Sequence, residues 1–597
     1  MRKTILKSSL LIGLTLLGIS SLTNNANADK KQTKNKALQE IADDHKSDAG
    51  RYFIQDYKTN TSDNLTPDNN ASIDLLSQMN KLWQPGSDWN NGTRLNTKIL
   101  DENINLSDKI AKERTKSQED AAWLDDKNDM DYSVQEGLGN LTDYFRKQAN
   151  ITGGYTSVPS DAENKDYDTN WDKQEVTGDP NSTLGSVVKL ADTLKDGNYS
   201  SSSSSKKYFK YPRPFRWDGT SVTNAQDNGV IIPTLKLSAK ADPVNDYGFP
   251  SGHTNSSYLT AYALAYAYPQ KFQQLLTRAS EVGNNRIVAG RHSPLDVIGG
   301  RVLGTALAAS ILNDPANKQL KEDAYKQAQS VLKSSEADDN DYGVGNQKEN
   351  AQKYNYRLTY GFSKIANSKQ IYRVPKGAEV LLETRLPYLT DAQRRAVLAT
   401  TELPTGYPIL DDGEGWGRLN LYNAANGYGQ LVSKTTVSMN AKKGGYNAKD
   451  TWSNDITGVG KLIKDGTGSL TLSGKNTFQG GVAINGGELN AANASALGSG
   501  NVINNSGALT LSSKQVTVKG SYQQLDKGTT VVAKKGRLIV KKGATLGGTL
   551  KLNGGEFKNG DKIMSYASHK GKFKKVTGLS KGLHIVYNNH DISIARK

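Results

Sequence analysis

Three short blocks in the middle of the chain bring together the residue types that phosphoryl-transfer chemistry requires. Residues 206–214 read KKYFKYPRP, residues 250–253 read PSGH, and residues 285–296 read NRIVAGRHSPLD. As spacings these are K-x6-RP, PSGH and R-x5-H-x3-D, in that order. A phosphoryl group in transfer carries negative charge on its oxygens, so its catalysis depends on fixed positive charge and on positioning. We therefore expect the three blocks to form one phosphate-handling site.

The polar residues of these blocks can hold the phosphoryl oxygens. Arg213 and Arg286 each offer a planar fork that binds two oxygens, and Lys206 adds a mobile point charge. Ser251 can present a hydroxyl, and Gly252 lets backbone N–H groups approach a ligand closely. We expect these residues to bind the substrate.

Taken together, the blocks resemble the type 2 phosphatidic acid phosphatase and vanadium haloperoxidase superfamily, and residues 200–315 look closest to its secreted bacterial acid phosphatases. The resemblance implies that His292 is the nucleophile, forming a phosphohistidine, and that His253 protonates the leaving oxygen. Asp296 lies four residues after His292, so on a helix its carboxylate can orient the imidazole. One position departs from the family: Asn285 stands where a serine is common, although its amide can still donate a hydrogen bond.

The resemblance implies an acid phosphatase that hydrolyses small phosphate monoesters, needs no metal or other cofactor, and is inhibited by vanadate, a phosphate mimic. A neutral His292 and a protonated His253 must coexist, which predicts best activity in mildly acidic conditions. The chain has no cysteine, which excludes thiolate zinc sites, thiol catalysis and disulfides. Three other functions stay open: a vanadium-dependent haloperoxidase, a lipid phosphate phosphatase, and a surface adhesin with a vestigial catalytic domain.

The N-terminus predicts export. Basic residues at positions 2, 3 and 7 precede the apolar run 10–19, and Ala26-Asn27-Ala28 offers a small-residue cleavage site. We therefore interpret residues 1–28 as a signal peptide. The apolar run is short for a membrane span, and no later stretch of the sequence approaches that length. We expect a secreted protein, extracellular or associated with the cell wall, with no transmembrane segment in the mature chain.

The 597 residues are too many for a single core, and their composition and hydrophobic pattern change along the chain. We expect a polar N-terminal segment at 29–90, a helical acid phosphatase domain at 91–335, a family-like extension at 336–435, and a basic β-solenoid at 440–597. The expected fold class is an all-α catalytic domain followed by a C-terminal β-solenoid. Within the first domain we expect helices at 186–194 and 294–312, and a flexible surface loop at the six serines 200–205.

Short alternating runs separated by glycine-rich turns predict the solenoid. Pairs of apolar residues spaced two apart recur along it: Leu470/Leu472, Val482/Ile484, Leu509/Leu511, Leu538/Val540 and Leu550/Leu552. Residues 460–500 closely resemble the passenger repeat of autotransporters. Since no further domain follows in this sequence, we expect an extracellular stalk or binding surface rather than a self-secreting autotransporter.

Nearly all of the net charge of +16 lies near the C-terminus. Residues 501–597 hold sixteen Lys and two Arg against three Asp and one Glu, which leaves +14. On an exported protein such a tail favours anionic cell-wall polymers as partners, and its sparse aromatic residues argue against nucleic acid. A second interpretation stays open, in which the lysines keep a strand-rich module from pairing at its edges.

Overall fold

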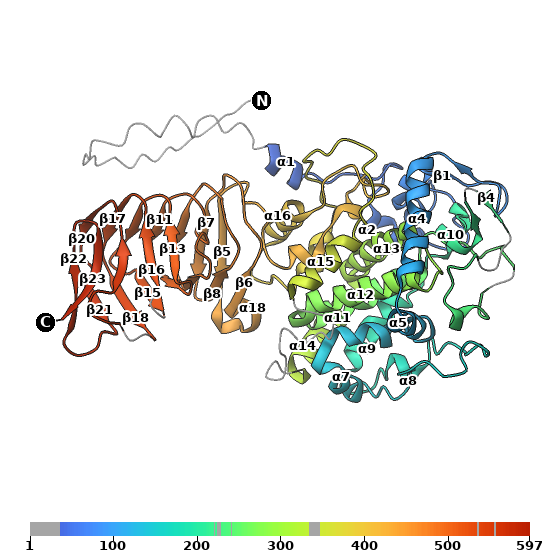
Figure 1. The fold of residues 1–597 in the computed structure, drawn as a ribbon, viewed down its shortest axis with the longest axis horizontal. Helices are drawn as coiled ribbons and strands as arrows, with labels where there is room; N and C mark the ends of the chain where they lie inside the picture. Colours follow the sequence, from blue (N-terminus) through green and yellow to red (C-terminus); the bar gives the residue numbers. More distant parts are fainter. Residues whose placement is uncertain are drawn as a thin grey trace, which may run out of the picture.

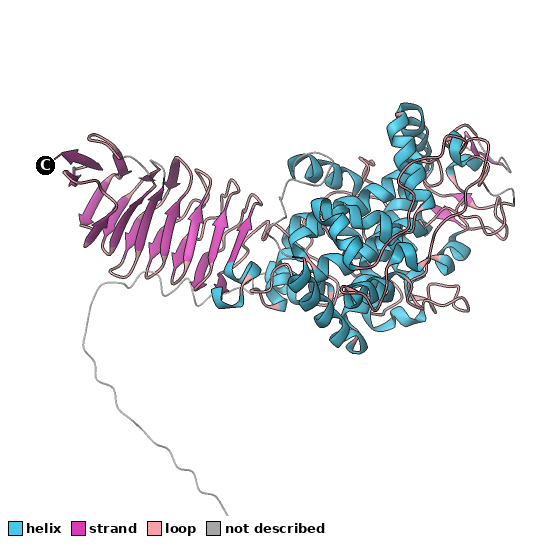
Figure 2. Ribbon diagram, turned by 90° about the horizontal axis from the view of Figure 1, so that it is seen from below, coloured by secondary structure: helices cyan, strands magenta, loops and turns pink. Residues whose placement is uncertain are grey.

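The computed structural model describes residues 36–219, 221–223, 228–239, 242–332, 347–533, 536–554 and 557–596. Within these residues a helical domain is followed by an elongated β-solenoid that extends away from it on one side (Figures 1 and 2). The predicted order of a helical domain and a C-terminal β-solenoid is confirmed. The predicted signal peptide at 1–28 lies outside the described residues.

Three long helices form the centre of the helical domain: α11 (Gly252–Ala267), α12 (Phe272–Val288) and α13 (Pro294–Asn313). Every residue of α13 from Pro294 to Leu312 is buried, and the helix coincides with the one predicted at 294–312. By length and composition α13 could cross a membrane, but it is apolar all round and wholly enclosed by the domain, as a core helix is.

Glycines on α13 let it lie unusually close to α11. A Cβ atom at Gly300 would stand 2.5 Å from the carbonyl oxygen of Ser251, and one at Gly304 would stand 2.8 Å from that of Asn255. Because no side chain fits in these gaps, the two helices pack backbone to backbone. Their N-terminal ends are joined by a hydrogen bond from the Ser251 N–H to the Asp296 carbonyl, of 2.8 Å.

The other helices surround this centre (Figure 1). The α-helices are α1 (Lys36–Ala42), α2 (Phe53–Asp56), α3 (Ala71–Leu75), α4 (Thr97–Glu113), α5 (Lys116–Lys127), α6 (Met130–Gln135), α7 (Thr142–Gln148), α8 (Gln174–Thr177), α9 (Gly185–Lys195), α10 (Ser203–Phe209), α14 (Lys318–Val331), α15 (Gln347–Arg357), α16 (Asp391–Thr401), α17 (Leu421–Ala424) and α18 (Gly445–Ala448). The 3-10 helices are η2 (Tyr57–Thr59), η3 (Ser77–Lys81), η4 (Glu136–Leu141), η5 (Pro214–Arg216), η6 (Pro233–Leu235), η7 (Pro269–Lys271), η8 (Pro315–Asn317), η10 (Ala378–Leu382), η11 (Trp416–Arg418) and η12 (Ala441–Lys443). Two short antiparallel pairs complete the domain, β1 (Trp83–Gln84) with β2 (Thr93–Arg94) and β3 (Trp217–Asp218) with β4 (Ser221–Val222).

The run of six serines is not the flexible surface loop that its composition predicts. Residues 203–205 open helix α10, and Ser200, Ser202, Ser204 and Ser205 are buried. Neighbouring segments engage their polar groups: the Ser204 hydroxyl donates to the Thr61 carbonyl (2.7 Å) and the Ser200 hydroxyl to the Leu194 carbonyl (2.6 Å). Buried carbonyl partners therefore override the local preference of serine for mobile backbone.

The segments on either side of the predicted helical domain pack into the same hydrophobic core. Phe53 and Met79 from the N-terminal side are buried, as are Leu398 and Trp416 from the C-terminal side. The Phe53 N–H donates to a carboxylate oxygen of Glu414 (2.8 Å), which ties the two flanks together.

The solenoid consists of three sheets, of which two run along its length and the third lies in its C-terminal half. One is a parallel sheet of β6 (Lys449–Trp452), β8 (Ser469–Leu472), β10 (Glu488–Ala491), β12 (Ala508–Leu511), β15 (Thr529–Ala533), β18 (Thr549–Asn553) and β21 (Lys575–Thr577). The second, also parallel, has β5 (Thr435–Met439), β7 (Leu462–Gly466), β9 (Val482–Ile484), β11 (Val502–Asn504), β14 (Tyr522–Gln524), β17 (Gly543–Leu546) and β20 (Ser568–Gly571). The third contains β13 (Gln515–Val518), β16 (Arg537–Val540) and β19 (Lys562–Ser565), and the antiparallel strands β22 (Leu583–Tyr587) and β23 (Asp591–Arg596) close it at the C-terminal end.

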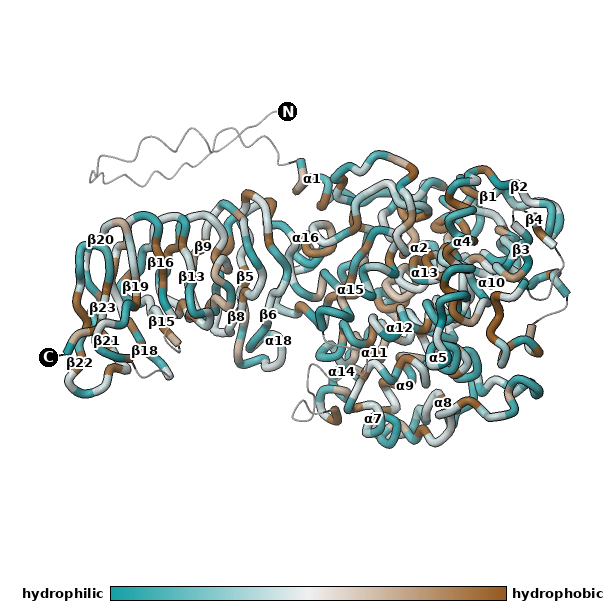
Figure 3. The backbone as a smooth tube through the Cα atoms, in the orientation of Figure 1, coloured by the Kyte–Doolittle hydropathy of each residue, from teal (hydrophilic) through white to brown (hydrophobic). Residues whose placement is uncertain are grey.

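Equivalent residues of successive coils stack in register. Val482 pairs with Leu462 and Val502, twenty residues before and after it. On the neighbouring sheet Leu470, Leu489 and Leu509 are in register and fully buried. Polar and apolar residues alternate along these coils (Figure 3), as expected of strands that bury one face. Each apolar residue of the five predicted pairs is buried within a strand.

Buried polar contacts join the solenoid to the helical domain. Asp450, on the first strand of one solenoid sheet, accepts hydrogen bonds from Arg385 (2.8 Å) and from the hydroxyl of Tyr388. The indole N–H of Trp452 donates to the same hydroxyl (2.8 Å), and its ring packs where a side chain at Gly427 would stand. The first coil of the solenoid is therefore also part of the helical domain's surface.

Candidate active site

The three sequence blocks meet where helices α11 and α13 begin. Ser251 is the N-cap of α11, and its hydroxyl accepts the N–H of Thr254 (3.3 Å). Ser293 caps α13 in a reciprocal capping box with Asp296, whose carboxylate accepts the Ser293 N–H (2.8 Å). Pro294 suits the first helical position because its missing N–H is not needed there. The capped helix starts fix the backbone beside both candidate catalytic histidines.

The turn between α12 and α13 places His292. Gly290 adopts a φ of +73°, and a Cβ atom there would lie 2.3 Å from the Val230 carbonyl oxygen. The ring of His292 is buried, with Nδ1 3.3 Å from Asp296 Oδ2 and Nε2 3.2 Å from Arg213 Nη1. With the carboxylate as the acceptor, Nδ1 carries the proton and Nε2 keeps its lone pair.

Arg213 is held by an ion pair on its far side. Its Nε donates to Asp246 Oδ1 (2.6 Å), and its Nη1 also donates to the Arg291 carbonyl (2.8 Å). Asp246 accepts a second bond from Arg216 Nη2 (3.0 Å), so it anchors two guanidinium groups. The fork beside His292 is thereby oriented before any substrate binds.

Lys206 reaches the site from helix α10. Its ammonium donates to the carbonyls of Tyr247 (2.9 Å) and Gly248 (3.0 Å). A Cβ atom at Gly248 would stand 2.7 Å from Asp296 Oδ2, so only glycine lets this segment pass the carboxylate that orients His292. Lys206 and Asp296 are thus linked through one tightly packed turn.

Arg286 lies in the last turn of α12 and is buried. Its Nη1 donates to Asp126 Oδ1 at the end of α5, while its buried Nε has no hydrogen-bond partner within the described part of the chain. The preceding residue, Asn285, donates to Asp125 Oδ2 (2.7 Å), the carboxylate that also binds Arg278. Asn285 therefore ties α12 to α5.

His253, in the first turn of α11, is half-buried. Its Nε2 is enclosed and finds no hydrogen-bond partner among the residues that the structure describes. The ring meets that of Trp171 edge to face, with centroids 4.8 Å apart. Gly252, next to it, borders the cavities on this side of the site.

An excess of positive charge is the main electrostatic feature of the site. Burial lowers the pKa of His292 well below its usual value, and Arg213 and Lys206 lower it further. Burial and Arg286 do the same to the pKa of His253, although Asp126 raises it. Burial, followed by repulsion from Arg213, also lowers the pKa of Lys206 to about 7. Each group resists taking a further proton, as expected of a site that awaits an anion.

The orienting carboxyl group is perturbed in the opposite direction. Burial raises the pKa of Asp296 to about 6, although the Ser293 N–H and the nearby cations favour its charged form. Asp126 differs: burial opposes its ionisation, but Arg286 and Arg291 lower its pKa well below the usual value. Both acids are therefore charged near neutral pH, for different reasons.

The structure brings the predicted site residues into one neighbourhood. His292, Asp296 and Arg213 are in direct contact, and Lys206, Arg286 and His253 act on the same ring through space. Ser251 lies behind them, fully buried, with its hydroxyl bound to the backbone and side chain of Thr254. The supporting residues Asp126, Asp246, Gly248 and Trp171 were not predicted, because each stands outside the three blocks.

The helical domain places two histidines among cationic side chains, and comparison with known proteins bears on what this region is. Residues 192–319 match the PAP2 superfamily, and residues 462–491 match the passenger-associated-transport repeat. Both resemblances are confirmed: the chain contains a PAP2 superfamily domain and a passenger-associated-transport repeat.

Curated relatives fall into two groups. The "Non-specific acid phosphatase" of Salmonella typhi is 34% identical over 137 residues, which are 23% of this chain and 50% of that protein. The "Extracellular serine protease" of Serratia marcescens is 32% identical over 164 residues, covering 22% of this chain and 16% of the protease. The "Neisserial autotransporter lipoprotein NalP" of Neisseria meningitidis serogroup B is 29% identical over 214 residues, covering 31% and 19%. The chain spans about half the length of the acid phosphatase and less of the other two.

Proposed function

We propose that this chain is an acid phosphatase that hydrolyses phosphate monoesters through a phosphohistidine on His292, without a metal ion. The observation that carries the proposal is the cluster of Lys206, Arg213 and Arg286 around a histidine whose Nε2 keeps its lone pair and faces Arg213. A phosphate dianion supplies the charge that this cluster lacks, and fixed donors at the developing negative charge are the main source of catalysis in such sites.

In the first step His292 Nε2 attacks phosphorus and the bond to the leaving oxygen breaks. In the free protein Arg213 Nη1 faces Nε2, and a bound phosphoryl oxygen would take over this donor. Asp296 holds the Nδ1 proton and stabilises the positive charge that forms on the ring. The cations hold the equatorial oxygens throughout.

His253 carries the proton in both steps. Its Nε2 has no partner among the described residues, so it is free to give a proton to the leaving oxygen. In the second step the same nitrogen takes a proton from water, which attacks phosphorus and releases phosphate from His292. The negative charge of bound substrate raises the pKa of His253 from its low value in the free protein, so binding itself creates the acid.

The charge of the site also supports metal independence. A divalent cation would have to enter a space already surrounded by Lys206, Arg213 and Arg286, at a cost in Coulomb energy. These side chains do the work that a metal ion does in other phosphatases.

Extracellular location belongs to the same proposal. It is supported by the predicted signal peptide and by relatives that are named as an extracellular protease and an autotransporter lipoprotein. The wall polymers predicted as partners of the basic tail remain a prediction.

The test is hydrolysis of an aryl phosphate by the purified full-length protein, with and without excess chelator. We expect turnover in both, competitive inhibition by vanadate, and acid-labile phosphate on His292 after rapid quenching. His253→Ala should accumulate this intermediate from substrates with good leaving groups. Label on another residue would contradict the mechanism, loss of activity with chelator would contradict metal independence, and vanadate-dependent halide oxidation without phosphatase turnover would assign a haloperoxidase.

A further inference from the structure

Two adjoining cavities lie near the candidate acid His253, and the smaller one borders its side chain. One, of 260 Å³, is lined by His253, Gly252 and Trp171 among others. The other, of 720 Å³, shares Gly252, Lys195 and Asp196 with it. His253 would protonate the leaving oxygen, so the space beside it is where the rest of the leaving group extends. The chemistry of this space therefore bears on which phosphate esters the site accepts.

Carboxylates are the most numerous charged groups on the walls of these cavities. Asp129, Asp172, Asp192 and Asp196 line them, while Lys195 is the single lysine or arginine among the described lining residues. The Lys195 ammonium lies 2.9 Å from Asp129 Oδ2 and 3.0 Å from Asp196 Oδ2. One ammonium leaves a large excess of negative charge, in contrast to the cationic cluster around His292.

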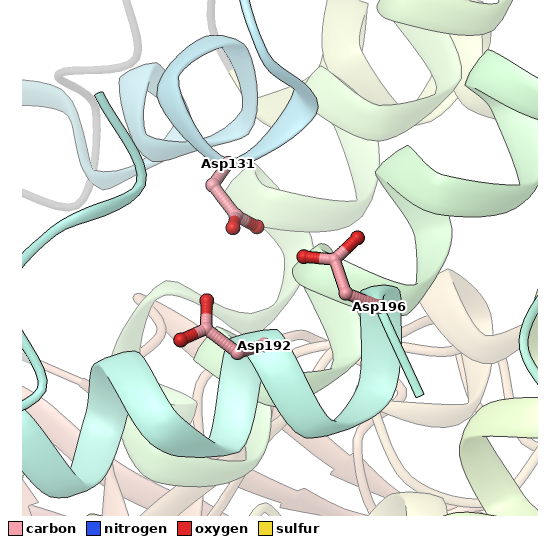
Figure 4. A group of neighbouring side chains, drawn as sticks. All are labelled: Asp131, Asp192 and Asp196. Carbon is pink, nitrogen blue, oxygen red and sulfur yellow. The ribbon is translucent and has the colours of Figure 1, made fainter. Parts of the chain in front are cut away.

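A buried oxygen without a donor faces the same space. Asp131 is 1% exposed and accepts the Thr260 hydroxyl at Oδ1, but its Oδ2 has no hydrogen-bond donor within the described part of the chain. The Lys195 ammonium stands 3.6 Å away, beyond hydrogen-bonding distance. The carboxylate of Asp131 points toward the space between Asp192 and Asp196 (Figure 4). A buried carboxylate oxygen that has an ion pair but no hydrogen-bond donor is incompletely satisfied, so it favours a further positive partner.

The titration of these acids agrees with the excess of negative charge. Burial, with repulsion from Asp129, raises the pKa of Asp131 to about 7 against the attraction of Lys195. Burial likewise raises the pKa of Asp192 to about 6. Both acids would be stabilised in their charged form by one more cation.

An organic cation fits this space better than a metal ion. One carboxylate oxygen of each of Asp131, Asp192 and Asp196 lies within 4.8 Å of the others, which is spacing that a metal ion could use. However, Lys195 already pairs with two of the three, and a divalent ion would stand beside its ammonium. An ammonium or quaternary ammonium has a lower charge density and can occupy the wider cavity next to Asp172 and Asp196.

Trp171 supplies a suitable aromatic wall. It is 41% exposed, although it lies against His253 and lines the smaller cavity. Its indole N–H donates to the Asn128 carbonyl (3.1 Å), which fixes the ring. A fixed tryptophan beside carboxylates is the combination that binds quaternary ammonium groups best.

We infer that this acidic pocket is the leaving-group subsite and that it selects phosphate monoesters of amino alcohols, whose leaving group carries an ammonium or quaternary ammonium. The inference rests on the proposed phosphatase function. Cations on one side of His253 would bind the phosphoryl group, and carboxylates on the other side would bind the positive end of the alcohol.

The test compares two substrates of the same shape with the purified full-length protein. One is choline phosphate, and the other is its neutral isostere in which a carbon atom replaces the nitrogen. We expect kcat/KM to favour choline phosphate about tenfold at low salt. The ratio should rise with pH between about 5 and about 7, because Asp192 and Asp131, with pKa values of about 6 and about 7, become charged.

Charge-removing variants locate the effect. Asp172→Asn combined with Asp196→Asn should reduce the ratio to about one. Asn suits position 172 because the native Asp172 has a φ of +58°, which Asn tolerates. Asp526→Asn, an exposed carboxylate far along the solenoid, removes the same type of charge and should leave the ratio unchanged. Comparing two substrates on each variant cancels any general loss of activity.

The outcomes separate this inference from the function on which it rests. Without turnover of any monoester, the aryl phosphate included, both fail. Turnover of the aryl phosphate with a choline-to-isostere ratio near one overturns the subsite alone. A ratio that vanishes with excess chelator also overturns it, because the carboxylates would then bind a metal ion.

Discussion

The two regions of this molecule bury polar groups in different ways. The helical domain encloses full charges, such as Arg278 with Asp125 and Arg286 with Asp126, joined across more than 150 residues of sequence. The solenoid instead encloses neutral amides that bond to adjacent coils: Asn476 accepts the N–H of Ile456 (2.8 Å) and donates to the Ala496 carbonyl (2.7 Å). In the described residues most buried ion pairs lie in the helical domain, whereas the solenoid buries amide ladders and few charges, such as Lys464.

The difference has an energetic basis. A buried ion pair costs desolvation energy that its attraction only partly recovers, so it is weak evidence for stability and better evidence for function. In the solenoid each buried amide finds its hydrogen-bond partners on adjacent coils. The stability of the stacked coils then grows roughly with their number. The comparison predicts that substitutions in the helical domain mainly change catalytic activity, whereas those in the solenoid mainly change the stability of the stacked coils.

Removing one histidine from each region is the strongest test of this contrast. His292→Ala should lower kcat at least about 1,000-fold, since the nucleophile is lost, while the far-UV circular dichroism stays native. His590→Ala removes an exposed histidine of the solenoid and should retain full activity. Comparable losses in the two variants would mean that the helical domain does not hold the active site.

The junction between the regions should respond most strongly in stability. Asp450→Ala leaves Arg385, which is 7% exposed, without the carboxylate that neutralises it. We expect the free energy of unfolding in denaturant to fall by about 3–5 kcal/mol. Asp526→Ala breaks the exposed pair with Lys574, and it should leave the free energy of unfolding unchanged within experimental error. Equal effects would show that the two regions are not joined through Asp450.

The same contrast explains how far the sequence could be interpreted. The strand pairs of the solenoid, such as Leu470/Leu472, were predictable because alternation is a local pattern. The groups that would touch phosphate were predictable because they lie in three compact blocks. Asp126 and Asp246 were not predictable from the sequence. Each pairs with an arginine far away in the chain, and no sequence spacing indicates such a partner. The serine run was misinterpreted for the same reason, since its partners Thr61 and Leu194 lie outside it.

Close packing at the site gives a third test. In Gly248→Ala the new Cβ atom would lie 2.7 Å from Asp296 Oδ2, so the carboxylate that orients His292 must shift. We expect kcat to fall about tenfold to 100-fold with little change in KM, because orientation rather than binding is lost. The matched control is Gly543→Ala in the solenoid, where the nearest atom is 3.4 Å away. An unchanged kcat in Gly248→Ala would argue against an orienting role for Asp296.

The pH profile tests the buried charges directly. The pKa of His253 is low in the free protein because of burial and Arg286, and a bound phosphate dianion should raise it. Since protonated His253 is the active form, activity falls as pH rises through this pKa. The alkaline limb of kcat should therefore lie about one pH unit or more above that of kcat/KM.

Two variants assign that alkaline limb. Asp126→Asn removes a charge that raises the pKa of His253, so the limb of kcat/KM should move to lower pH. Burial lowers the pKa of Lys464, inside the solenoid, to about 8, so Lys464 could titrate in the same pH range. If the alkaline limb stays in place in Lys464→Met, titration of Lys464 is not its source. Coincident limbs for kcat and kcat/KM would contradict substrate-induced protonation of His253.

The smallest expected effect concerns the basic end of the solenoid. If its +14 charge binds anionic cell-wall polymers, replacing Lys541, Lys542 and Lys570 with Gln should weaken binding to isolated walls about twofold to fivefold at low salt. The control replaces Lys98, Lys109 and Lys112, which are equally exposed on α4 of the helical domain. Attachment should also weaken as salt rises, because exposed charges are screened beyond a Debye length of ~8 Å at physiological ionic strength.

These substitutions are preferable to a truncation near residue 440, which would remove Asp450 and Trp452 and so damage the helical domain's own surface. Equal loss in both triple variants would mean that net charge rather than the solenoid governs attachment, and salt-independent binding would point to recognition by the shape of its coils.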